Sequence, residues 1–213
     1  MRWYVTYKLS YRDVCDLMEE RGVSVVHTTV LRWVQCFVPA FEKLWKKYER
    51  PVGSSWRVDE TYIKVKGRWR YLYRAVDKQG QTVDFLLSEN RDKAAAVRFF
   101  RKAIGNNEVP EKITLDGSQA SLQAVAELKA EGVLPAQTLV RTNKYLNNII
   151  EQDHRMAPQR CYPMLGFKTF GNAQVTLSEI ELENKIKKGQ FDTSDITRPG
   201  AMILQVWEAV LAT

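Results

Sequence analysis

The stretch 56–77, WRVDETYIKVKGRWRYLYRAVD, decides the fold of this chain. It contains two runs that are rich in aromatic and β-branched residues, and such runs favour extended strands. Lys66 and Gly67 lie between the runs and are typical of a tight turn. A third run of the same kind, QTVDFLLSE at 81–89, follows a turn sequence at 78–80. The pattern predicts three consecutive antiparallel strands.

Helices and short strands are expected after these three strands. A helix over about 92–104 comes first, and the strand KITLD at 112–116 then ends on an acid. A helix over 118–131, a strand around 137–141 and a helix from Tyr145 complete the pattern. The order βββ-α-β-α-β-α predicts an α/β protein in which a mixed sheet carries helices on its faces.

Residues 1–50 are predicted to be helical. Ser10 is placed to cap the helix YRDVCDLMEERG, for which Gly22 supplies a stop. A short connection leads into TTVLRWVQCFVPAFEKLWKKYE at 28–49. Two helices joined by a short turn with a glycine indicate either a helix-turn-helix or a plain helical hairpin. In a helix-turn-helix, Arg32 would be exposed early in the second helix and would read a DNA groove.

Charge and composition narrow the class of protein. The net charge is +7, and the excess of Lys and Arg lies in 1–50, 57–74 and 141–190. A basic surplus interleaved with aromatic residues suits a polyanion such as nucleic acid, although Lys and Arg also protect strand edges from pairing. The three cysteines are too far apart to indicate a disulfide framework or a zinc ribbon. Without a membrane-spanning apolar stretch or a signal peptide, the chain is expected in the cytoplasm.

Three acids are candidates for joint chemistry. Asp59 lies in the first predicted strand, Asp116 at the carboxyl end of the fourth, and Glu151 on the helix after the fifth. Hard cations such as Mg²⁺ prefer oxygen ligands, and two such ions can activate a hydroxyl that attacks a phosphodiester. Each acid also has an ordinary interpretation, as a strand-edge charge, a turn former or an exposed helical charge.

The spacing of the acids is similar to that of a known protein family. Thirty-four residues separate Asp116 from Glu151, and the chain resembles the bacterial insertion-sequence transposases with a D,D(34)E triad, which serve small replicative, cointegrate-forming elements. The stretches that carry the resemblance include WRVDETYIKVKGRWRYLYRAVDKQGQTVDFLLSENRD, KYLNNIIEQDHR and PMLGFKTFGNAQVTLSEIELENKIKKGQ. It covers about residues 2–190. It implies a ribonuclease-H-like catalytic domain behind a helix-turn-helix that recognises terminal inverted repeats.

The resemblance also assigns residues and cofactors. It carries the catalytic and metal-binding triad onto Asp59, Asp116 and Glu151, with one or two Mg²⁺ or Mn²⁺ ions. Side chains within one turn of Glu151 on its helical face suit phosphate and sugar contacts, and His154 has the alternative role of supporting a metal ligand by a hydrogen bond. The candidate DNA-contacting residues are Arg32, Lys144, Asn147, Asn148, His154, Arg155, Arg160 and Lys168.

The sequence departs from the family in three places. Pro158 stands where relatives usually have Lys or Arg, and Gly117 stands where they usually have lysine. The chain also opens directly on RWY, so truncation of the DNA-binding segment stays open. The acids are intact, but cations that would hold DNA are missing. Pro158 is expected to end or kink its helix at about Ala157.

The sequence therefore predicts a transposase that cleaves DNA at terminal inverted repeats and joins it to target DNA. A catalytically degenerate or truncated derivative that binds DNA or a partner is the alternative, and a ribonuclease-H-like nuclease is a weaker third. The expected partners are DNA and further copies of the chain, in a homodimer or higher oligomer. No membrane partner is expected, and the protein is expected at the bacterial nucleoid. The predicted organisation is a helix-turn-helix segment at 1–50, a linker at 51–55, a ribonuclease-H-like catalytic domain at 56–190 and a tail with an apolar helix at 191–213.

Overall fold

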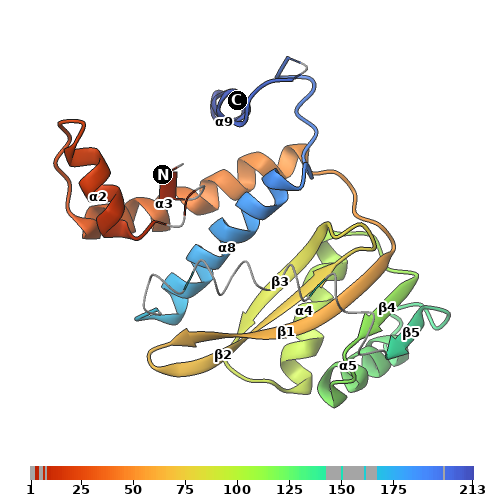
Figure 1. The fold of residues 1–213 in the computed structure, drawn as a ribbon. Helices are drawn as coiled ribbons and strands as arrows, with labels where there is room; N and C mark the ends of the chain where they lie inside the picture. Colours follow the sequence, from red (N-terminus) through yellow and green to blue (C-terminus); the bar gives the residue numbers. More distant parts are fainter. Residues whose placement is uncertain are drawn as a thin grey trace. The chain divides into compact units, whose positions relative to one another are not determined.

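The computed structural model describes residues 3, 4, 7, 9–142, 150, 161, 167–198 and 200–213 (Figure 1). The chain divides into two units. Residues 51–161 form one, here called the central unit, and residues 1–50 together with 162–213 form the other, here called the terminal unit. None of the helices in the described ranges is long and apolar enough to cross a bilayer.

A five-stranded mixed sheet forms the central unit. Its order is β3-β2-β1-β4-β5, in which β1, β2 and β3 are antiparallel neighbours and β4 and β5 run parallel to β1 (Figure 1). The strands are β1 (Ser55–Val65), β2 (Arg68–Val76), β3 (Thr82–Ser88), β4 (Lys112–Leu115) and β5 (Leu139–Thr142). The three consecutive antiparallel strands predicted from the sequence are confirmed.

The turn between β1 and β2 sets the register of the sheet. Lys66 has φ 50° and Gly67 has φ 74°. Two successive positive φ values are typical of a type I′ turn, whose twist matches that of the flanking strands. Val65 and Arg68 are therefore paired directly across the turn.

Two helices cover one face of this sheet. They are α4 (Lys93–Asn106) and α5 (Gln119–Ala130). Phe99 and Phe100 of α4 and Leu128 of α5 pack with Trp56 and other sheet residues in one buried cluster. The apolar side chains of β1, β2 and β4 on this face explain why the helices lie there. The mixed sheet with flanking helices is the ribonuclease-H-like fold that the sequence analysis expects.

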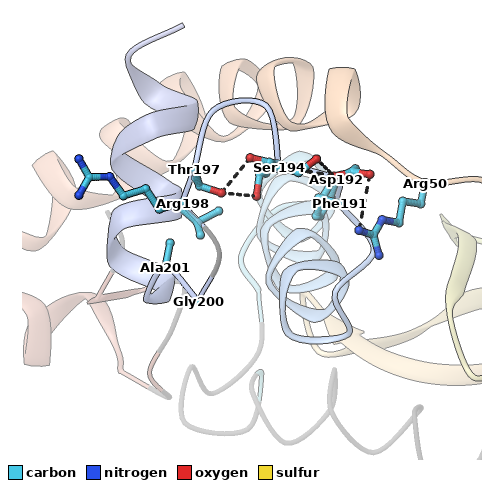
Figure 2. A pocket seen from close by; sticks show the side chains of 10 residues that line it. Arg50, Phe191, Asp192, Ser194, Thr197, Arg198, Gly200 and Ala201 are labelled. Atoms are coloured by element: carbon cyan, nitrogen blue, oxygen red, sulfur yellow. Dashed lines mark hydrogen bonds and ion pairs between the residues drawn. The ribbon is translucent and has the colours of Figure 1, made fainter.

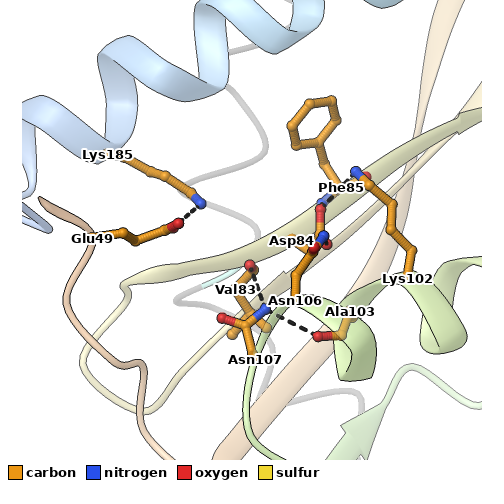
Figure 3. Close-up of polar contacts among 9 residues, drawn as sticks. All are labelled: Glu49, Val83, Asp84, Phe85, Lys102, Ala103, Asn106, Asn107 and Lys185. Atoms are coloured by element: carbon orange, nitrogen blue, oxygen red, sulfur yellow. Dashed lines mark hydrogen bonds and ion pairs between the residues drawn. The ribbon is translucent and has the colours of Figure 1, made fainter. Parts of the chain in front are cut away.

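Polar contacts fix α4 against β3. Asp84 of β3 accepts hydrogen bonds from Lys102 Nζ and Asn106 Nδ2, both at 2.8 Å (Figure 3). Asn107 Nδ2 donates to the carbonyl oxygen of Val83 at 3.2 Å. Asp84 is almost fully buried, and its pairing with a lysine and an amide offsets the cost of removing the carboxylate from water.

The terminal unit is helical. Its elements are α2 (Tyr11–Glu19), α3 (His27–Trp45), the short 3₁₀ helix η1 (Lys46–Tyr48), α8 (Phe170–Lys187) and α9 (Ile203–Leu211). Ser10 caps α2 as predicted, because its hydroxyl accepts from Asp13 N at 3.2 Å while its own N–H donates to the Asp13 carboxylate at 2.6 Å. This reciprocal capping box satisfies two N–H groups at the start of the helix.

Two buried clusters hold these helices together. Val14 of α2 packs against Val30, Val34 and Val38 of α3. A second cluster joins the end of α3 to α8 and α9 and contains Trp45, Leu182, Ile186, Trp207 and Val210. An ion pair between Lys185 and Glu49 also ties α8 to the segment after η1 (Figure 3). The apolar helix expected after Pro199 therefore packs on the core of this unit.

Two boundaries differ from those drawn on the sequence. The expected linker 51–55 is bonded into the central unit, since Gly53 N donates to Asp77 Oδ2 at 2.9 Å and Ser55 already belongs to β1. The expected catalytic segment 56–190 includes α8, which packs beside α3 in the terminal unit. The helix expected from Tyr145 lies outside the described residues, apart from Ile150, which is helical and buried.

Candidate active site

Strand pairing brings two of the three predicted acids together. β1 and β4 are parallel neighbours whose last register pair is Val58 with Leu115. Asp59 and Asp116 are the next residues along the two chains, and both are half-buried. Residues paired across a sheet lie on the same face with neighbouring side chains. The register therefore places these two carboxylates side by side at the carboxyl end of β4.

A buried cation lies on the other side of Asp59. Arg74 of β2 is the antiparallel register partner of Asp59, so its side chain shares the same face of the sheet. The Arg74 residue is fully buried. Two neighbouring carboxylates repel each other, and a guanidinium on the same face offsets part of that repulsion.

Local hydrogen bonds orient both carboxylates. Asp59 Oδ1 accepts from Glu60 N at 2.8 Å, and Asp116 Oδ1 accepts from Ser118 N at 3.0 Å. The second bond closes a small turn that leads from β4 into α5. Gly117 in this turn has φ +95°, a conformation that residues with a Cβ rarely adopt.

Arg91 links this pair of acids to a third carboxylate. Its Nε donates to Glu60 Oε2 at 2.5 Å, and its Nη2 lies 3.9 Å from Asp116 Oδ2. Ser121 of α5 donates to the second oxygen of Glu60 at 3.0 Å. The Glu60 side chain is 4% exposed, so its charge is compensated by these two donors.

The pKa of Arg91 reflects this environment. Burial lowers the pKa of the guanidinium, but the charge of Glu60, the hydrogen bond to it and the charge of Asp116 raise it above its usual value. Arg91 is therefore a charged partner for both Glu60 and Asp116. Sequence reasoning missed Glu60 and Arg91, because their contact spans 31 positions and neither residue belongs to a recognisable local pattern.

The position of the third predicted acid, Glu151, stays a prediction. Glu151 lies outside the described residues, and so do the candidate DNA contacts Lys144, Asn147, Asn148, His154, Arg155 and Arg160, together with Pro158. In the described ranges no group of three or more His, Cys, Asp or Glu side chains is placed to hold a metal. Asp59 and Asp116 supply two of the three carboxylates that such a site would need.

Two predicted DNA contacts lie in the terminal unit. Arg32 is exposed on α3, and Lys168 is exposed immediately before Thr169, whose hydroxyl caps α8 by accepting from Asn172 N. A hydrogen bond joins Gln35 Nε2 to Asn172 Oδ1. It ties the α3 turn after Arg32 to the first turn of α8, so the two cations lie on elements that are fixed to each other.

A hollow of about 350 Å³ in the terminal unit belongs to the loop between α8 and α9 (Figure 2). Arg50 lies 3.6 Å from Asp192, and the hydroxyl of Ser194 donates to Asp192 at 2.7 Å. The hydrogen bonds from Ser194 and the charge of Arg50 hold the pKa of Asp192 below its usual value. These charged and polar groups are bonded to one another, so contacts within the loop account for their positions around the hollow.

Comparison with known proteins defines the class. Residues 53–190 match a family described as a DDE domain. This range contains β1, β4, Asp59, Asp116 and Glu151. The chain belongs to the DDE-domain family of insertion-sequence transposases, which are enzymes that act on DNA.

Individual relatives have the same character. The transposase for insertion sequence-like element IS431mec from Staphylococcus aureus is 42% identical over 180 residues, which are 84% of this chain and 78% of the relative. The transposase for insertion sequence element IS257 in transposon Tn4003, also from Staphylococcus aureus, is 41% identical over the same length.

Similar solved structures are retroviral integrase cores. The HTLV-2 integrase catalytic core domain in complex with magnesium has a TM-score of 0.47 and 16% identity, over 75% of this chain and 98% of that one. The catalytic core domain of BIV integrase has a TM-score of 0.42 and 12% identity, over 75% of this chain and 95% of that one.

Proposed function

We propose that this transposase cleaves DNA at the terminal inverted repeats of its element and joins the freed 3′-hydroxyl to target DNA. The observation that carries the proposal is the register of β1 and β4, which sets Asp59 beside Asp116 in a chain of the DDE family. Two carboxylates on neighbouring strands, together with a third acid, would form a catalytic triad.

The donor set fits a divalent metal. Asp59 and Asp116 are half-buried, offer only oxygen donors, and have one oxygen each held by a backbone N–H. Mg²⁺ and Mn²⁺ prefer such ligands and keep several waters. Asp59, Asp116 and Glu151 would hold one or two ions, which supply activation of the attacking hydroxyl and stabilisation of the leaving oxygen.

The chain's own residues have separate tasks in this reaction. Arg91, which is itself bonded to Glu60, lies beside the Asp116 carboxylate, and the turn through Gly117 orients that carboxylate. Arg32 and Lys168 contact DNA from the terminal unit. DNA is the partner, and a homodimer or higher oligomer brings two element ends together.

Single amide substitutions test the proposal. Asp59→Asn, Asp116→Asn and Glu151→Gln keep the size of each side chain and remove its charge. Each is expected to reduce strand transfer below detection with Mg²⁺ or Mn²⁺, while binding to the element's own ends stays near that of the wild type. Glu108→Gln, at an exposed position between α4 and β4, is the matched control and should retain activity.

The outcomes separate the competing functions. A wild-type chain that binds ends but transfers no strand with either metal would favour a degenerate, binding-only derivative. Cleavage of RNA–DNA hybrids without end specificity would favour a ribonuclease-H-like nuclease. Full activity of Asp116→Asn would show that the triad is assigned to the wrong residue.

A further inference from the structure

The outer part of the β1–β2 hairpin is a two-stranded ribbon. β1 pairs with β4 only over Ser55–Val58, and β2 pairs with β3 only over Tyr71–Val76. Between these stretches and the turn, no other strand within the described ranges pairs with the hairpin. Figure 1 shows β1 and β2 continuing beyond β3 and β4. Over this part of the hairpin, β1 and β2 are therefore bonded only to each other among the described strands.

One face of the ribbon carries exposed aromatic rings. Trp69 is 61% exposed and Tyr62 is 48% exposed, whereas Ile63 and Val65 on the other face are buried. The rings of Tyr62 and Trp69 meet edge to face at 6.5 Å, and Tyr71 lies 5.4 Å from Tyr62. We call Tyr62, Trp69 and Tyr71, with the adjacent Lys64, the aromatic platform.

The ribbon is rich in cations, of which Lys64 lies on the face of the platform while Arg70, on the other face, is paired with Glu89. Residues 62–71 contain four Lys or Arg and no Asp or Glu. Lys64 Nζ lies 5.9 Å from the centroid of the Trp69 ring, so a cation and an exposed ring share one surface. This combination of flat rings with neighbouring cations is the chemistry that binds single-stranded nucleic acid.

The platform lies on the face of β1 opposite to Asp59, and Arg91 connects that face with Asp116. Tyr62 is two residues beyond Glu60 on the same face of β1, and Glu60 is bonded to Arg91. Arg91 in turn contacts Asp116 and lies within electrostatic range of Tyr62. The platform is therefore linked to Asp116 through Arg91 and Glu60, so a DNA strand that passes Arg91 from Asp116 reaches Tyr62 next.

We propose that the aromatic platform binds an unpaired base of the DNA strand next to the reaction site, with Lys64 on an adjacent phosphate. Bases inside a duplex already stack on their neighbours, so an exposed ring gains a stacking partner only where a base is unpaired. The inference rests on the proposed function and adds the form of DNA that the site prefers.

Binding without chemistry tests this inference. The probes are a labelled duplex with a short single-stranded thymine tail and the same duplex fully paired, both in EDTA. Trp69→Leu keeps an apolar side chain and removes the ring. It is expected to weaken binding of the tailed duplex about 5- to 150-fold and to change binding of the paired duplex less than about twofold.

Matched variants separate stacking from charge and from folding. Trp69→Phe keeps a ring and should retain most of the preference for the tailed duplex. Lys64→Gln should lower the salt dependence of tail binding by about 0.7 in log–log slope, and Lys78→Gln, at the exposed turn before β3, should leave it unchanged. Because Trp69 is largely exposed, Trp69→Leu should keep the melting temperature of the wild type.

Three results would overturn the inference. Equal weakening on both duplexes would assign the platform to duplex DNA, and unchanged binding on both would remove it from the DNA path. Dissociation of an oligomer by Trp69→Leu, seen by sedimentation, would assign the face to a second copy of the chain. These experiments measure DNA binding and not strand transfer. They can therefore be interpreted even if the Asp59→Asn series shows that the proposed chemistry is wrong.

Discussion

Asp116 is held at the end of β4 by two contacts of different kinds. A backbone N–H fixes one oxygen, and the guanidinium of Arg91 lies beside the other while it bonds Glu60. The backbone contact depends on the turn, in which Gly117 has φ +95°. A residue with a Cβ would be strained in that conformation. Arg91 is the side-chain cation that lies beside this acid.

Removal of Arg91 tests this role. Arg91→Ala is expected to lower strand transfer by about 10- to 100-fold, as for loss of a residue that orients a metal ligand. It should also lower the free energy of unfolding by about 1–3 kcal/mol, because the nearly buried Glu60 carboxylate loses its charged donor. Transfer assays and denaturant titrations measure the two effects separately.

Glu60→Gln in the same background is the control. In the double variant the buried charge is gone, so stability should recover while activity stays low. Recovery of both would mean that Arg91 acts only through stability. End binding by the terminal unit should be the same in all of these variants.

At the scale of elements, local patterns specified the strands well. Alternating aromatic and β-branched residues, with the turn at Lys66-Gly67, placed β1 and β2 within one residue of their observed bounds. Asp59 within a strand and Asp116 after another followed directly. These features are readable because a two-residue period and a glycine turn are properties of adjacent residues.

Helix α8 was not predicted, and its composition explains why. Its buried residues include Glu179, Glu181, Glu183 and Asn184 as well as apolar ones. An apolar stripe at helical spacing is the usual sign of a packed helix, and polar residues at buried positions erase it. The link from Arg91 to Glu60 was equally unreadable, since it depends on how separate strands and loops come together.

The order of the elements in the terminal unit gives a prediction for α3. Arg32 is exposed on this helix, which follows the capped helix α2. If α3 reads a DNA groove, Arg32→Ala should weaken binding to the element's ends by about 1–3 kcal/mol and barely affect unrelated DNA. Lys43→Ala, exposed in the last turn of the same helix, is the matched control. Equal weakening on both DNAs would make Arg32 a phosphate contact.

The whole molecule consists of two units with separate cores. Phe99, Phe100 and Leu128 belong to the buried cluster of the central unit, whereas Val14 and Val34 belong to that of the terminal unit. The candidate acids Asp59 and Asp116 lie in the first unit, and Arg32 and Lys168 in the second. If Arg32 and Lys168 contact DNA as proposed, recognition and chemistry depend on different cores, although the terminal unit is built from both ends of the chain.

Core substitutions should therefore separate the two activities. Leu128→Ala leaves a cavity under α5, the helix that carries Ser121, and should cost about 2–5 kcal/mol of stability. It is expected to reduce strand transfer at temperatures where specific end binding persists.

Val34→Ala lies between α2 and α3 and should cost about 2 kcal/mol of stability. It is expected to reduce specific end binding at temperatures where the central unit is still folded.

Thermal unfolding followed with end-binding and strand-transfer assays at each temperature checks this expectation. Two transitions in the wild type, each shifted by one of the variants, would establish independent units. A single transition shifted by both variants, with both activities lost together, would contradict it. In that case unfolding of one core would spread to the other through the chain connections near Arg50 and Cys161. Specific end binding and strand transfer would then be lost at the same temperature.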